Sequence, residues 1–139
     1  MIRNVAAVVV GLIVGMAVNM ALVYLNVALF PMPEGVTFED TEGLATYMAT
    51  LPLQAFLLII LAHLGQAFVG GWVAARISTD RPMAVALIVG GLSLAGGVAN
   101  MMMMPLPWWM WMEIPLYLVV AWIAGNLVLQ CRAKKASTP

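Results

Sequence analysis

Long apolar segments alternate with short polar or proline-containing connections along the chain. Four such segments lie at residues 5–30, 51–75, 83–104 and 108–131, and each has 22 to 26 residues. About 20 helical residues cross the hydrocarbon core of a bilayer, and the strict polar–apolar alternation of a membrane β-strand is missing here. The pattern therefore predicts an all-α protein, a four-helix transmembrane bundle with helices at about residues 4–30, 51–77, 83–104 and 108–131.

The first apolar segment follows an early arginine, as the core of a secretory signal does. Its apolar part is too long for a signal, and no small-x-small cleavage site follows it cleanly. We therefore interpret it as a spanning helix. Residues 1–131 are then expected to form one membrane domain, with a basic tail at residues 132–139.

The connections contain the residues that commonly begin and end helices. Thr50 and Asp80 each stand two residues before a proline and are predicted to be N-caps. Pro105 and Pro107 are predicted to separate the third helix from the fourth, because proline disrupts helical hydrogen bonding.

The longest connection, residues 31–50, is predicted to be an outer loop that contains a short interfacial helix. This helix would cover residues 40–50 and present Leu44, Tyr47 and Met48 to the bilayer.

Composition agrees with a lipid environment and excludes several classes of function. Hydrophobic residues make up 64% of the chain and charged residues 9%, against about 25% charged residues in soluble domains. Six cationic residues balance six anionic ones, so no basic face and no nucleic-acid partner are expected. With a single histidine and a single cysteine, Cys131, neither a zinc motif, a disulfide within the chain, a catalytic metal site nor a resident cofactor is expected.

The cations indicate an orientation. All six fall on one side of the predicted bundle, whereas the opposite connections hold acidic residues and neither lysine nor arginine. The positive-inside rule then predicts that the N- and C-termini are both cytoplasmic. The six cations are Arg3, Arg76, Arg81, Arg132, Lys134 and Lys135.

The segment NMMMMPLPWWMWME, residues 100–113, combines six methionines and three tryptophans with one carboxylate. Tryptophans at this position are typical of an interfacial aromatic belt, and methionines of flexible packing at a helix end. The alternative is a soft-metal site, since thioethers favour Cu(I). Consecutive residues turn by 100° around a helix, so only pairs such as Met101 and Met104 share a face, and belt and packing are the favoured interpretation.

Two ionisable residues are predicted to lie within the membrane, which makes each a candidate for function. His63 falls near the midplane and Glu113 toward the outer face, with no intramembrane cation expected to pair with Glu113. If the fourth helix starts several residues before Pro115, a freed carbonyl lies beside Glu113. If it starts just before Pro115, Glu113 is an exposed interfacial N-cap.

Each predicted helix carries one face of small and polar residues, and these faces are expected to meet in the bundle centre. The polar residues either form simple hydrogen bonds between helices or line a small cavity in which His63 carries a proton or binds a ligand. The candidate polar site is His63, Gln66, Asn19, Asn100 and Glu113. The glycines predicted to bring helices into close contact are Gly11, Gly15, Gly70, Gly97 and Gly125.

The segments LAHLGQAFVGGWVAARI (61–77), GGVANMMMMPLPWWM (96–110) and YLVVAWIAG (117–125) resemble a group of small bacterial four-helix integral membrane proteins with no established activity. In that group an AH-x-x-G…AAR helix precedes an N-x-x-x-x-P-x-P-x-W turn. The resemblance implies a multi-pass protein of the bacterial inner (plasma) membrane. The positions that match its pattern are His63, Asn100, Pro105, Pro107 and Trp109.

Three functions are compatible with these features, and none is enzymatic. The first, which the sequence favours, is a non-catalytic accessory or structural subunit that packs in the bilayer with itself, as a homo-oligomer, or with a larger membrane complex. The second is a small homo-oligomeric transporter or channel that uses His63, Asn100 and Glu113. The third is a protein that binds haem, a pigment or a soft metal through His63 or methionine pairs.

Overall fold

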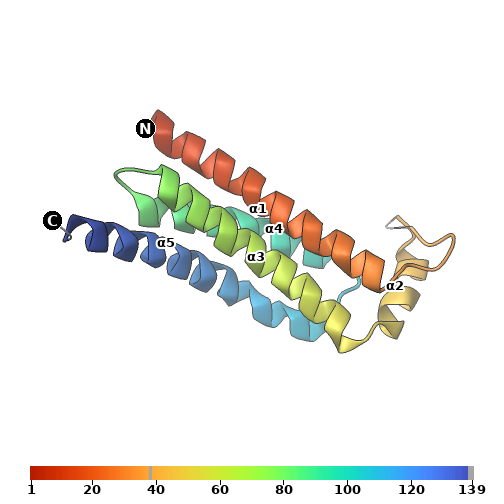
Figure 1. Ribbon diagram of the computed structural model, residues 1–139. Coiled ribbons are helices and arrows are strands. Elements are labelled where there is room, and N and C mark those ends of the chain that lie inside the picture. The colour runs from red at the N-terminus through yellow and green to blue at the C-terminus, as the bar shows by residue number, and fades with distance from the viewer. Residues whose placement is uncertain (38, 138–139) are drawn as a thin grey trace.

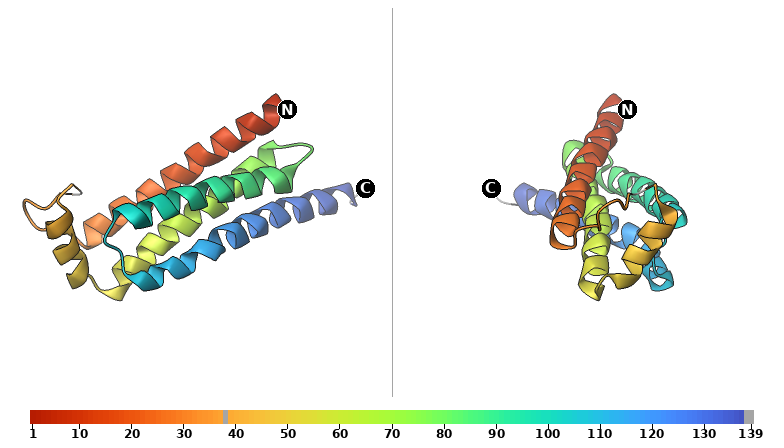
Figure 2. Two further views of the ribbon diagram at one scale, coloured as in Figure 1. Left: turned by 180° about the vertical axis from the view of Figure 1, so that it is seen from behind. Right: turned by 90° about the vertical axis from the view of Figure 1, so that its right-hand side faces the viewer.

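The structure is a computed structural model, and it describes residues 1–37 and 39–137. Its elements are α1 (Ile2–Leu29), α2 (Thr41–Thr50), α3 (Leu53–Ile77), α4 (Pro82–Met103), the 3₁₀ helix η1 (Trp108–Glu113) and α5 (Ile114–Ala136). The helices α1, α3, α4 and α5 pack side by side as a bundle, and α2 lies across one end of it (Figures 1 and 2). The protein is all-α, as predicted.

Four helical segments are long and apolar enough to cross a membrane, namely Ile2–Leu29, Leu53–Ile77, Pro82–Met103 and Trp108–Ala136. Large apolar side chains are exposed all round the bundle, for example Ile13, Leu61, Ile88 and Trp122. In water such a surface would be unstable, whereas lipid chains solvate it. The protein is therefore a polytopic membrane protein.

Both termini and the connection between α3 and α4 lie at one end of the bundle, and α2 lies at the other (Figure 1). All six cations belong to segments at the first end, which we call the cationic end; the opposite one is the α2 end. Arginine side chains at the cationic end satisfy carbonyl groups that α3 leaves free where it stops. Arg3 Nε donates to Ile77 O at 2.9 Å, and the Arg132 guanidinium donates to the carbonyls of Ala75, Arg76, Ser78 and Thr79.

Three expectations about helix ends were wrong. Thr50 is the last residue of α2, where its hydroxyl donates to Tyr47 O at 2.7 Å, and Pro52 stands at the N-cap of α3. Asp80 does not cap α4 but accepts a hydrogen bond from Asn4 at 3.4 Å. Helix α5 continues to Ala136, so most of the predicted basic tail is helical, and Arg132 ties this last part to the end of α3.

Asp80 lies at the exposed connection between α3 and α4. Its own backbone N–H and the Asn4 amide hold the pKa of the Asp80 carboxyl below its ordinary value. The carboxylate therefore stays ionised and links the start of α1 to this connection.

Helix α2 is present where a short helix was expected, and the Asp40 side chain caps it by accepting from Gly43 N at 3.0 Å. Its orientation was predicted wrongly. Leu44 and Met48 do not face the bilayer but are buried against Phe56, Met101 and Met110, which belong to three other elements. Helix α2 is thus a cover on the bundle, and burial of its apolar face against protein removes it from lipid contact.

Glycines bring α1 and α3 close together. A Cβ added to Gly11 would lie 2.5 Å from Gly70 O, and one added to Gly15 would lie 2.6 Å from Gln66 O. Elsewhere a Cβ at Gly125 would lie 2.8 Å from Met83 Sδ, and one at Gly97 would overlap the Tyr117 ring. Close backbone approach of this kind is the main packing device between helices in lipid.

Gly11→Ala should destabilise the protein by about 1–3 kcal/mol, because the nearest atom is a backbone oxygen that cannot rotate away. Thermal unfolding in a mild detergent would measure the loss. Gly91→Ala is the matched control, since a Cβ added to Gly91 meets nothing within 4 Å. Equal effects of the two changes would contradict the assignment of Gly11 to a tight helix contact.

Candidate functional site

The two ionisable residues predicted to lie within the membrane are in contact. His63 Nδ1 of α3 lies 2.8 Å from Glu113 Oε1 at the end of η1. Glu113 is 1% exposed and His63 8%. His63 is ten residues from the start of α3 and fourteen from its end, or about 15 Å and 21 Å along the helix. The pair therefore lies well inside the span.

Neither expectation for Glu113 was fully correct. Regular helix does begin at Ile114, with Pro115 in its first turn, and the Trp111 carbonyl accepts the Ile114 N–H, so no freed acceptor remains there. Glu113 is nevertheless buried rather than an exposed cap, and it contacts His63, a partner that was not predicted from the sequence.

The 3₁₀ geometry of η1 explains this burial. With three residues per turn, side chains three positions apart point the same way. Met110 and Glu113 form the inward row and are 0% and 1% exposed, whereas Trp108 and Trp111 form an outward row and are 81% and 46% exposed. An α-helix would have rotated Glu113 away from the Met110 direction by about 60°.

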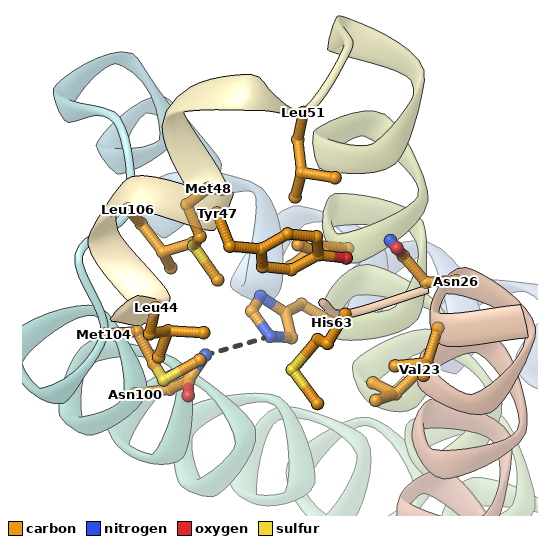
Figure 3. A pocket seen from close by; sticks show the side chains of 13 residues that line it. Val23, Asn26, Leu44, Tyr47, Met48, Leu51, His63, Asn100, Met104 and Leu106 are labelled. Carbon is orange, nitrogen blue, oxygen red and sulfur yellow. Dashed lines mark hydrogen bonds between the residues drawn. The ribbon is translucent and has the colours of Figure 1, made fainter. Parts of the chain in front are cut away.

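Asn100 of α4 completes the contacts of the imidazole ring. Its Nδ2 lies 3.4 Å from His63 Nε2 (Figure 3). An amide nitrogen can only donate, so Nε2 is the acceptor and the neutral ring carries its proton on Nδ1, facing the Glu113 carboxylate. If His63 takes up a second proton, rotation of the Asn100 amide would bring its oxygen to Nε2–H. Asn100 can therefore serve both protonation states of the ring.

Glu113 itself is incompletely satisfied. Oε1 accepts from His63 and, at 3.4 Å, from the Tyr117 hydroxyl of α5. Oε2 is buried and has no hydrogen-bond partner among the residues that the structure describes. A buried carboxylate oxygen without a donor is costly, so this pair is poorly suited to a purely structural role.

A cavity of about 230 Å³ lies between His63 and α2. Figure 3 shows that α2 contributes Leu44, Tyr47 and Met48 to its lining, together with His63 and Asn100. Its walls are mostly apolar. The Tyr47 hydroxyl donates to Phe30 O, and burial raises the pKa of this phenol, so the hydroxyl keeps the proton that it donates and holds α2 against the end of α1.

A second cavity, of about 310 Å³, lies between α1 and α4, and we call it the α1–α4 groove. Asn19, Gln66, Ser93 and Tyr117 line it together with His63 and Asn100. His63 and Asn100 thus border both cavities. The five residues of the predicted polar site are therefore gathered around one place, with Glu113 behind His63 rather than at a cavity wall.

The methionine-rich segment has two kinds of position. Met101 and Met110 are buried in the cluster under α2, and the Trp109 ring meets Phe56 edge-on at 5.9 Å. Met102 and Met103 are 76% and 81% exposed. Among the described residues, no three His, Cys, Asp or Glu side chains gather in a way that would hold a metal ion.

Asn26 is a polar residue of this region that was not among the predicted site residues. Its amide donates to Ala55 O at 2.6 Å, and it lines the cavity under α2. Asn26 follows Asn19 by seven residues, two helical turns, so both occupy one face of α1. The seven-residue spacing from Asn19 could therefore have predicted that Asn26 belongs to the polar face of α1.

Comparison of the chain with models of protein families, with curated proteins and with solved structures finds no match. No family is therefore identified, and the resemblance to small bacterial four-helix proteins stays a prediction.

Because His63 is the only histidine, ¹⁵N-histidine labelling gives signals from this ring alone. In bilayers we expect the neutral form of the ring to be protonated at Nδ1 and not at Nε2, since Glu113 faces Nδ1. Solid-state NMR shifts of the two nitrogens distinguish the tautomers. Glu113→Gln should change the Nδ1 signal, whereas Glu42→Gln, which removes an exposed carboxylate of α2, should not. A ring protonated at Nε2 alone would contradict the assigned contacts.

Proposed function

We propose that the protein is a small membrane transporter or channel in which the His63–Glu113 pair takes up and releases protons. The observation that carries the proposal is this buried pair, whose imidazole borders cavities on two sides. An ionisable pair inside a membrane is expensive and is commonly part of a proton or substrate pathway.

The hydrogen bonds support cyclic protonation. Glu113 holds Nδ1–H and leaves Nε2 as the acceptor, and the residue borders both cavities. The contact from Asn100 to Nε2 is long, at 3.4 Å, so a proton donor or a hydroxyl group can displace it at small cost. A proton reaching Nε2 creates an imidazolium whose Nδ1–H still donates to Glu113.

The direction of the pathway follows from the cations. With the cationic end in the cytoplasm, as the positive-inside rule predicts, α2 and the cavity beneath it face the outside. For a bacterial protein this corresponds to the plasma membrane. The cavity under α2 would then be the outer approach to His63, and α2 would cover its entrance.

Proton movement can be tested in liposomes that enclose a pH-sensitive dye. After a pH step, wild-type protein should accelerate the internal pH change, and His63→Gln or Glu113→Gln should reduce the protein-dependent rate at least about tenfold. Removing either partner abolishes the contact between His63 and Glu113 and leaves the other residue buried without it. Glu42→Gln is the control for loss of an acidic residue outside the pair. Wild-type rates in both pair variants would reject the proposal.

A second candidate function is that of a non-catalytic accessory subunit, within a homo-oligomer or a larger membrane complex. It is favoured by Ala95 and Ala99, which are exposed one turn apart on α4 and would let another helix approach closely. Outside the four spans, the residues that the structure describes form only short connections and α2, so a partner would be expected to bind within the membrane.

Cysteine cross-linking in native membranes tests this second function. In a Cys131→Ser background, Ala95→Cys should form cross-links to itself or to another chain, because a partner helix would lie against this face. Ile123→Cys, at an exposed position of α5, is the control. Cross-linking that is equal at both positions would indicate random collision and would reject a specific interface on α4.

A further inference from the structure

We infer that the α1–α4 groove binds a neutral, hydroxyl-bearing lipid that enters from the bilayer. This assigns a substrate class to the proposed transporter and in that sense rests on the proposed function, although binding itself is measured without transport.

The first ground is Asn19. Its side chain lines the groove and the residue is only 9% exposed, yet its amide has no hydrogen-bond partner among the residues that the structure describes. Within a membrane, water is scarce and a primary amide without partners is destabilising. A ligand group in the groove would supply the missing hydrogen bonds.

The second ground is the other polar side chains that line the groove, which together with Asn19 we call its polar floor. Several of their donors and acceptors make only long hydrogen bonds. Gln66 Nε2 reaches Ser93 Oγ only at 3.5 Å, and His63 Nε2 receives only the long contact from Asn100. Imidazole Nε2 needs a donor, whereas the amides of Asn19 and Gln66 offer both donors and acceptors. A hydroxyl group both donates and accepts, so it matches this floor better than a pure acceptor such as an ester carbonyl.

The third ground is the absence of charge. While His63 is neutral, no charged side chain lines the groove in the part of the chain that the structure describes, and Glu113 is covered by His63. The floor lies about 15 Å from the α2 end of α3, close to half of a hydrocarbon core about 30 Å thick. A charged phospholipid headgroup would lose its hydration at this depth, whereas a neutral hydroxyl headgroup loses far less. The site therefore favours a neutral molecule.

The fourth ground is the shape of the opening. Met16 and Met20 of α1 are 51% and 39% exposed, and Gly96 of α4 is exposed, so the rim of the groove is open toward lipid. Its volume of about 310 Å³ is at the lower end of the range of small-molecule sites. That space accommodates a headgroup and the start of an acyl chain, while the remainder of the chain stays in the bilayer against the methionines.

Native mass spectrometry of the full chain in mild detergent tests the inference with three probes. They are 1-monooleoylglycerol, methyl oleate, which has the same acyl chain without hydroxyls, and dioleoylphosphatidylglycerol, which is charged. We expect one 1-monooleoylglycerol per chain, bound at least about tenfold more tightly than either of the others, since each unmatched polar group costs on the order of one tenfold step. Equal binding of methyl oleate or of the charged lipid would overturn the inference.

Two variants place the site, each with a matched control. Gly96→Leu should block the groove without disturbing the fold, because a Cβ there meets nothing within 4 Å; Gly91→Leu has equal room on the same helix but lies outside the groove. Asn19→Leu removes the unpartnered amide of the groove. Asn126→Leu makes the same change in α5, where the buried Nδ2 also has no partner among the described residues but lies outside the groove. Loss of at least about tenfold in affinity is expected for Gly96→Leu and Asn19→Leu only. Unchanged binding in Gly96→Leu would overturn the assignment even if Asn19→Leu failed to fold.

The two proposals fail separately. Lipid binding without protein-dependent proton movement would reject the transport function and leave the binding site in place. Proton movement without selective binding of 1-monooleoylglycerol would reject the lipid site and leave the proton function in place.

Discussion

A carboxylate held among membrane helices needs a partner, and the contact between Glu113 and His63 supplies it. Glu113 belongs to η1 and His63 to α3, so the contact fixes the position of the α4–α5 connection against α3. Tyr117 adds a hydrogen bond from α5, and Asn100 reaches the same ring from α4. Three of the four spanning segments are thus tied together at one depth by hydrogen bonds around a single imidazole.

The first spanning helix is held differently, and this difference creates the groove. Toward the cationic end, α1 meets α3 through Gly11 and Gly15 and packs its Val8 and Leu12 against α4 near Val89. Toward the α2 end, the α1 side chains that face α4 border empty space instead. The first half of α1 thus packs tightly through Gly11 and Gly15, whereas the larger residues Met16, Asn19, Met20 and Val23 of its second half line an opening.

Much of the fold follows from the sequence because it depends on composition and period. Segment length and hydropathy predicted the four spanning helices, and the predicted glycines all lie where an added Cβ would be crowded. The meeting of His63 and Glu113 was not predicted, since fifty residues separate them and the outcome depends on the turn that Trp108–Glu113 adopts. The 3₁₀ geometry of these six residues turns the Glu113 side chain inward, and the hydrophobic pattern of the sequence does not predict that geometry. The inward face of α2 was missed for a related reason, because an amphipathic segment fits a bilayer surface and a protein surface equally well.

The position of α2 has a consequence for how the protein is made. Leu44 and Met48 leave the ribosome well before Met101 and Met110, the side chains against which they finally pack. During synthesis the apolar face of α2 therefore stays uncovered at the membrane surface until α4, η1 and α5 have been inserted. Docking of α2 would then be the last step of folding. A chain truncated before η1 would leave Leu44 and Met48 without Met110 and so expose an apolar surface of the kind that quality-control proteases recognise.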